Sequence, residues 1–234
     1  MTKTQKQVKL STMNICPYCE KQFARDTSMA KHSCERKRRY LAKDEPASRL
    51  GFLAFCKFWE IHHRGNKQTI DAFIRSPYYL AFRKFGLYCV DIRALNVEAL
   101  TRWLLKNNHA IDRWCSDRLY TEWMTEYLRI EPVTDALMRS IEYSVDWEKD
   151  TGMKANDLLR YANTSRLILA ISTGRLSPWC IYCAETGQNW LTKLQAEELK
   201  LIWDYVNPDD WNQILLDRRE DRVYTTEILT KAGW

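Results

Sequence analysis

The sequence predicts a mainly α-helical protein, and two observations lead to this fold class. After a short cysteine-containing segment, apolar residues recur at the three- and four-residue spacing of helices almost to the end of the 234-residue chain. Ten Trp, twelve Tyr and seven Phe supply the apolar area of a packed core. The length suits one large domain or two small ones. We therefore expect a folded, helical body.

Composition and pattern divide the chain into five parts. We expect a flexible N-terminus over 1–12 and a cysteine-containing segment over 13–35. A basic linker or helix follows over 36–48, interrupted at Pro46. A helical domain over 49–150 and a helical C-terminal subdomain over 151–234 complete the chain.

The domain over 49–150 contains several amphipathic segments. They are LGFLAFCKFWEIHH, AFRKFGLYCV after a Ser-Pro cap, VEALTRWLLKNN, SDRLYTEWMTEYLRI and PVTDALMRSIEYSVDWEKDTG. The last has Pro in its first turn and Gly152 near its end, the favoured asymmetry of a helix. The apolar positions expected to face the core are Leu50, Leu53, Phe55, Phe58, Ile61, Val97, Leu100, Trp103, Leu104, Leu119, Trp123, Tyr127 and Ile130.

The C-terminal subdomain continues with NDLLRYANTSRLILAISTG and QAEELKLIWDYVN, and a turn at NPDD leads into a last helix. The run TSRLILAIS is apolar enough to be a buried strand, so a short strand pair near 165–185 is the alternative there. Aromatic residues at helical spacing are expected in the core rather than stacked on bases. They are Trp103, Trp114, Trp123, Trp203 and Trp211.

The net charge of +6 is concentrated at the N-terminal end. Residues 1–45 hold eleven Lys and Arg against five Asp and Glu, whereas residues 46–234 hold 25 of each kind. A basic segment beside a neutral body is typical of an arm that meets a polyanion. The alternative is a solvated tail with no partner.

Nothing in the sequence predicts membrane insertion or export. No apolar run approaches eighteen residues, and MTKTQKQVKLST lacks the apolar region of a signal peptide. We expect the protein to act in a reducing compartment, the cytoplasm. Its eight cysteines are then thiols or metal ligands rather than a disulfide framework.

The segment NICPYCEKQFARDTSMAKHSC has the residues of a small metal-binding module. Cys16 and Cys19 form a C-x-x-C pair, with Phe23, Met29 and His32 following at fixed intervals. This pattern resembles the two-cysteine two-histidine zinc finger family, and the resemblance implies a ββα fold around one zinc ion over 13–35. About twenty residues with one Phe and one Met cannot fold alone, so zinc would supply the missing stability.

The fourth ligand departs from that family. Arg36, Lys37 and Arg38 occupy the positions of the second histidine, and none of them binds zinc. Cys34 is the local candidate, although two residues on a helix are about 200° apart. We therefore predict that the helix ends at about His32 and that the chain turns at Ser33, as in short Cys-Cys-His-Cys fingers. His62 or His63 remains an alternative fourth ligand.

The likeness also implies a set of nucleic-acid contacts. The helix positions that read bases in DNA-binding fingers fall on Arg25, Ser28 and Lys31. The next segment offers phosphate contacts, namely Arg36, Lys37, Arg38, Arg39 and Lys43. One finger covers about three base pairs, so we expect backbone-dominated binding to DNA, or to RNA, with little sequence specificity.

Two other groups of residues resemble enzyme motifs, but each is only weak evidence for enzymatic activity. Trp179, Cys180 and Cys183 form a W-C-x-x-C run like that of thioredoxin-like oxidoreductases, but AETGQN after it is a poor helix opening. Half a metal site or two buried thiols are the other interpretations. His62, His63, Asn66, Asn108 and His109 invite comparison with HNH nucleases, yet these histidines fall at a helix end and in a turn.

The runs STGRLSPWCIYC, NPDDWNQIL and KAGW resemble segments of uncharacterised proteins of large tailed bacteriophages. This resemblance implies a viral protein in a bacterial host and no particular activity. Since the body offers no catalytic set, we hypothesise an accessory factor. Its finger and basic segment would hold nucleic acid, and its helical body would dock a partner of replication, transcription or DNA processing. An assembly component that uses the finger for docking and a metal-dependent nuclease are the alternatives.

Overall fold

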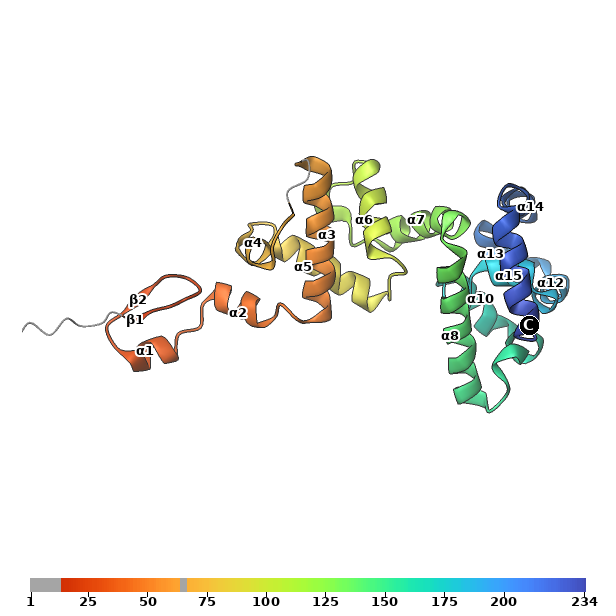
Figure 1. The fold of residues 1–234 in the computed structure, drawn as a ribbon, viewed down its shortest axis with the longest axis horizontal. Helices are drawn as coiled ribbons and strands as arrows, with labels where there is room; N and C mark the ends of the chain where they lie inside the picture. Colours follow the sequence, from red (N-terminus) through yellow and green to blue (C-terminus); the bar gives the residue numbers. More distant parts are fainter. Residues whose placement is uncertain (1–13, 64–66) are drawn as a thin grey trace, which may run out of the picture. The chain divides into compact units, whose positions relative to one another are not determined.

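The computed structural model describes residues 14–63 and 67–234, so the predicted flexible segment 1–12 and Asn66 lie outside the described residues. The fold is mainly α with a small antiparallel strand pair near the N-terminus, as predicted (Figure 1). The chain divides into two compact units, Met1–Ser116 and Asp117–Trp234, called the first and second units below. This division falls at the start of α7 (Asp117–Ile130), whereas the sequence placed a boundary at 150.

The first unit carries the zinc-finger-like segment and a helical body. Its elements are β1 (Asn14–Ile15), β2 (Gln22–Phe23), α1 (Asp26–Ala30), α2 (Glu35–Leu41), α3 (Pro46–His62), α4 (Ile70–Arg75), α5 (Tyr79–Asp91), α6 (Val97–Lys106) and the 3-10 turn η1 (Ile111–Arg113). The strands pair Asn14 with Phe23 and Ile15 with Gln22.

The core of the first unit is built on the close packing of α3 against α5. A Cβ added to Gly86 would lie 2.0 Å from the carbonyl oxygen of Ala47, and one added to Gly51 would lie 2.6 Å from that of Phe82. The backbones therefore touch where glycines face each other. Around this contact lies a buried aromatic cluster, comprising Phe55, Phe73, Phe82, Phe85 and Trp114.

All secondary-structure elements of the second unit are helices or short 3-10 turns. They are α7 (Asp117–Ile130), α8 (Val133–Thr151), the 3-10 turn η2 (Ala155–Asp157), α9 (Leu158–Tyr161), α10 (Thr164–Ser172), α11 (Pro178–Cys183), α12 (Glu185–Leu191), α13 (Ala196–Val206), α14 (Pro208–Asp217) and α15 (Arg219–Lys231). Trp179 and Trp211 meet edge-to-face in its core, with ring centroids 5.5 Å apart. Gly152 ends α8 in the left-handed conformation, as its position predicted.

The strand alternative near 165–185 is wrong. The segment forms α10 and α11, capped by the side chains of Asn163 and Ser177. Leu167 and Ile171 are buried while Leu169 is 62% exposed. A strand would place all three on one face, whereas a helix separates the middle one.

Several predicted core positions are correct and a few are not. Trp114, Trp123 and Trp211 are buried, but Trp203 is 41% exposed and the prediction for it is wrong. The exposed exceptions among the helix-face residues are Leu53, Ile61 and Ile130. On α3 small residues form most of the buried face, because α5 lies so close, and Phe55 is the one large apolar residue buried beside them. Within the described residues, no helix is long and apolar enough to cross a membrane.

Candidate metal centre

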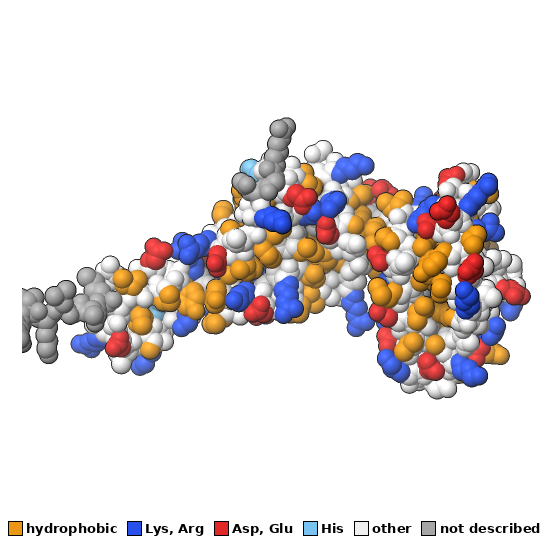
Figure 2. Space-filling model, viewed as in Figure 1, with side chains coloured by type: hydrophobic (Ala, Val, Ile, Leu, Met, Phe, Trp, Pro, Cys, Tyr) orange, Lys and Arg blue, Asp and Glu red, His pale blue; other side chains and the backbone are white. Residues whose placement is uncertain are grey.

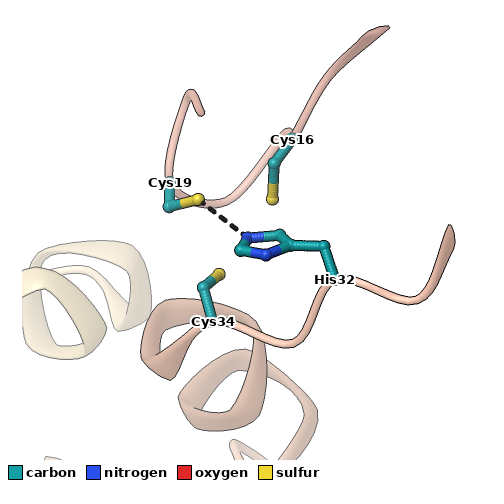
Figure 3. Close-up of side chains that lie close together, drawn as sticks. All are labelled: Cys16, Cys19, His32 and Cys34. Carbon is teal, nitrogen blue, oxygen red and sulfur yellow. Dashed lines mark hydrogen bonds between the residues drawn. The ribbon is translucent and has the colours of Figure 1, made fainter. Parts of the chain in front are cut away.

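The first two candidate ligands lie on a tight hairpin. Cys16 follows β1 directly, and its amide donates to the carbonyl of Lys21 at 2.9 Å. The turn closes with the Glu20 amide donating to the Cys16 carbonyl at 2.9 Å, and Glu20 takes a positive φ of 62°. The hairpin thereby presents the Cys16 and Cys19 thiols to the same side (Figure 3).

The other two candidates lie where the chain leaves α1 and enters α2. The helix α1 ends at Ala30, slightly before the predicted end at His32, and three irregular residues follow Lys31. Cys34 has extended backbone angles (φ −100°, ψ 162°) and is the N-cap of α2. Its sulfur accepts the Lys37 amide at 3.4 Å. Because the helix is interrupted, Cys34 reaches the same side as His32, as the sequence predicted.

The four side chains form a compact donor set. Their ligand atoms all lie within 4.8 Å of one another, and the Cys19 Sγ lies 3.2 Å from the His32 Nε2 (Figure 3). A tetrahedral zinc site with Zn–S bonds of about 2.3 Å has ligand atoms about 3.8 Å apart. Three sulfurs and one imidazole nitrogen at this separation fit zinc. Because all four positions would be filled by protein, a bound zinc ion would be of the structural kind, with no open position.

The environment of Cys16 favours its thiolate form. Burial acts to raise the pKa of this thiol, but hydrogen bonds from the backbone amides of Cys19 and Tyr18, together with those from the Cys19 and Cys34 thiols, outweigh it, and the pKa is lowered. The thiolate is the form that binds metal. The hairpin amides therefore help to hold a negative ligand.

The residues around the four ligands bury too little apolar surface to keep residues 14–34 folded. Phe23 stacks obliquely on the His32 ring, with centroids 4.7 Å apart, and both are only half-buried. No residue of α1 is buried. A bound ion would therefore contribute most of the stability of residues 14–34, in line with the expectation from the sequence.

The residues predicted to contact nucleic acid differ in their exposure to solvent. Those exposed on the surface are Arg25, Ser28, Lys31, Arg36 and Arg38, and Lys37 is half-buried. Arg39 turns inward: its Nη1 donates to the carbonyl of Ile74 at 3.0 Å, and its Nη2 pairs with Glu35. The amine of Lys43 lies 4.2 Å from the centre of the Tyr40 ring. We therefore leave Arg39 and Lys43 out of the proposed contact set.

The histidines of the HNH-like set make contacts with neighbouring residues of their own segments. His62 Nδ1 lies 2.9 Å from the Phe58 carbonyl, and His63 stacks on Trp59 at 3.9 Å. His109 stacks on Trp103. Among the described residues, the only group of three or more Cys, His, Asp or Glu with metal-binding geometry is the Cys16, Cys19, His32 and Cys34 set. That set includes Cys34 and neither His62 nor His63.

The W-C-x-x-C run lies in the core of the second unit. Cys180 and Cys183 are buried in α11, and burial raises the pKa of Cys180 to about 12 and that of Cys183 to about 11. A reactive thiol needs a lowered pKa. The segment after it, expected to be a poor helix opening, forms α12. Two buried thiols are the interpretation that agrees with this environment.

The charge distribution between the units was missed from the sequence. The first unit holds 22 Lys and Arg against 10 Asp and Glu, and the second holds 14 against 20, giving formal charges of +12 and −6. The body of the first unit is thus as basic as the N-terminal segment. Counting charge within each compact unit would have shown this.

Comparison with protein-family models, curated proteins and solved structures finds no match to this chain. The finger likeness therefore depends on the local motif and on the geometry of its four ligands. The resemblance of the C-terminal runs to bacteriophage proteins gains no support from these comparisons.

Proposed function

We propose that the first unit is a zinc-stabilised nucleic-acid-binding module and that the second unit docks a protein partner of replication, transcription or DNA processing. The observation that carries the proposal is the location of the Cys-Cys-His-Cys cluster within the half of the chain that has a formal charge of +12. A polyanion releases counterions when it meets such a surface, which favours binding without sequence recognition.

The surface of the first unit agrees with this role. On the face shown in Figure 2, Lys and Arg side chains are spread over both the finger and the helices after it, among apolar and acidic ones. Arg25 and Lys31 flank α1, and Arg36 and Arg38 are exposed on α2. Because α1 has only five residues, it offers few positions for reading bases. We therefore expect contacts to phosphates to dominate.

The proposal is tested by the salt dependence of binding. Fluorescence anisotropy of the zinc-loaded full-length protein with labelled DNA or RNA should give an affinity that falls steeply with salt. Replacing Arg38 by Gln should reduce the slope of log K against log salt by about one. Replacing exposed Arg219 of the second unit should leave the slope unchanged. Absence of binding even at low salt would refute the nucleic-acid role.

The docking role proposed for the second unit is supported by its surface. Leu169 on α10 and Leu201 on α13 are 62% and 67% exposed, and these two helices pack against each other. The net charge of −6 argues against a polyanionic partner for this unit. Purification of tagged protein from its native host should recover the same partner with Cys16→Ala/Cys19→Ala. Recovery should fail with Leu201→Ser, and loss only with the cysteine variant would instead make the finger the docking module.

A further inference from the structure

A groove of about 350 Å³ lies in the first unit beside the metal centre. Its wall comes from three segments that are distant in sequence, namely the cysteine hairpin, α2 and α4. The lining residues that carry chemistry are Tyr18, Arg36, Tyr40, Asp71 and Arg75. The volume is at the lower end of the range of about 300–1,000 Å³ for small-ligand pockets.

The wall of this groove is held in place by other contacts. The Tyr18 and Tyr40 rings lie 5.2 Å apart at 51°. Arg39, on the same helix as Tyr40, donates to the carbonyls of Ile74 and Ser76 at 3.0 and 3.3 Å. The hairpin is therefore joined to α2, and α2 to α4, so the groove is formed before any ligand binds.

The two arginines of the groove are available for a ligand. The guanidinium groups of Arg36 and Arg75 make no hydrogen bond or ion pair with any residue that the structure describes, although both residues line the groove. A guanidinium group binds phosphate through two parallel hydrogen bonds. The Tyr18 and Tyr40 rings offer apolar faces beside them.

The single carboxylate of the groove also matters for the ligand. Asp71 would repel a phosphate placed next to it, but it can accept a hydrogen bond from an exocyclic amino group of a base. A ligand with an aromatic ring, amino groups and a phosphate at one end would match all of these groups. A nucleotide has this combination.

We infer that the groove binds one unstacked nucleotide of a single-stranded nucleic acid. The base lies against Tyr18 and Tyr40, and its phosphate meets Arg36 and Arg75. In a duplex the bases are stacked and paired, so aromatic side chains reach them only in single strands, loops or ends. This inference rests on the proposed function and adds a preference for single strands to it.

The experiment compares the zinc-loaded full-length protein on a labelled single strand, DNA or RNA, with the duplex of the same sequence. The single strand should bind more tightly. Tyr18→Leu should weaken single-strand binding by about tenfold, since stacking contributes about 1–3 kcal/mol per base. Tyr18→Phe, which retains the ring, should not. Zinc content measured on both variants shows that the metal centre is intact.

Two matched variants, each of which removes one exposed positive charge, provide a second, independent test. Arg36→Gln and Arg38→Gln remove the same charge from the same helix, but only Arg36 lines the groove. Arg36→Gln should reduce the preference for single strands, whereas Arg38→Gln should lower both affinities and keep their ratio. Equal binding of duplex and single strand, with equal effects of the two variants, would overturn the inference and leave the proposed function standing. No binding to either would overturn both.

Discussion

The guanidinium carbon of Arg39 lies 4.6 Å from the centre of the Tyr79 ring. This stacking joins α2, which follows the metal centre, to the first turn of α5 in the helical body. The same guanidinium donates to two carbonyls at the end of α4. An arginine that looked like one more phosphate contact therefore fixes the finger segment to the body.

We predict that Arg39→Gln destabilises the first unit by about 2 kcal/mol. Hydrogen bonds to a charged group contribute about 1.5–3 kcal/mol, and the variant leaves the Ile74 and Ser76 carbonyls without that donor. Denaturant unfolding of the full chain measures the loss. Arg38→Gln, exposed on the same helix, should lie within about 0.5 kcal/mol of the wild type. Equal stability of the two variants would contradict the structural role of Arg39.

We predict that Cys34→Ser lowers the affinity for zinc by more than about tenfold. Changes to groups that only support metal ligands cost about 10–100-fold, and a lost ligand should cost at least as much. Titration with a competing chelator, followed by metal analysis, gives the affinity and the expected stoichiometry of one zinc per chain. Cys56→Ser is the matched control, because Cys56 is half-buried in α3, outside the donor set.

We predict that removal of the metal unfolds the finger and leaves the helical body folded. We expect chelation to abolish protection from hydrogen exchange in residues 14–34, since no residue of α1 is buried. The amides of α3 and α5 should remain protected, because their packing at Gly51 and Gly86 involves no metal ligand. Loss of protection in both regions would show that the body also depends on the ion.

The cluster of four candidate metal ligands was predictable because its information is local. The spacing of Cys16, Cys19 and His32 is set by a hairpin and one helix, and Cys34 needed only the chain to leave that helix. The role of Arg39 was not predictable, because its acceptors on Ile74 and Ser76 are 35 and 37 residues away. In the sequence it is one basic residue within ERKRRY.

Two further errors have physical causes. Leu53 and Ile61 were expected in the core because large apolar residues dominate a periodicity argument, but α3 packs through Ala47, Gly51 and Ala54. Residues 46–234 were taken as a neutral body because the charges of two different parts cancel in the sum. Residues 46–116 hold eleven basic and five acidic residues, and the net negative charge of the second unit offsets this positive excess. Charge has meaning for binding only within one surface.

Packing at Gly86 leads to a sharp prediction for stability. Gly86→Ala should cost about 3 kcal/mol, the upper part of the range for overpacking, because the clash at 2.0 Å is with the backbone of Ala47 and not with a movable side chain. Lys84→Ala, exposed on the same helix, should change stability by less than about 0.5 kcal/mol. Thermal unfolding of both variants decides the matter, and a neutral Gly86→Ala would refute the backbone contact.

The buried carboxyl of Glu131 should contribute more to the stability of the second unit in mild acid than at neutral pH. Burial raises the pKa of Glu131 above its ordinary value of 4.5, and the attraction of Arg139 and the Ser177 hydrogen bond only partly offset this. The folded state therefore binds the proton more tightly than the unfolded state. The contribution of Glu131 to the free energy of unfolding is largest below pH 4.5 and is lost as the pH rises through the pKa of the folded state.

Hydrogen exchange of the α8 and α11 amides as a function of pH, corrected for the intrinsic rate, measures this dependence. Glu131→Gln keeps an acceptor for the Ser177 hydroxyl, which lies 2.8 Å from Oε1, and has no proton to release. The stability of this variant should therefore vary less with pH than that of the wild type. Glu148→Gln, exposed on α8, should keep the wild-type profile. If the wild type instead gains stability relative to Glu131→Gln as the pH rises from 4.5, the raised pKa of Glu131 is wrong, and its pairing with Arg139 outweighs the cost of burying the charge.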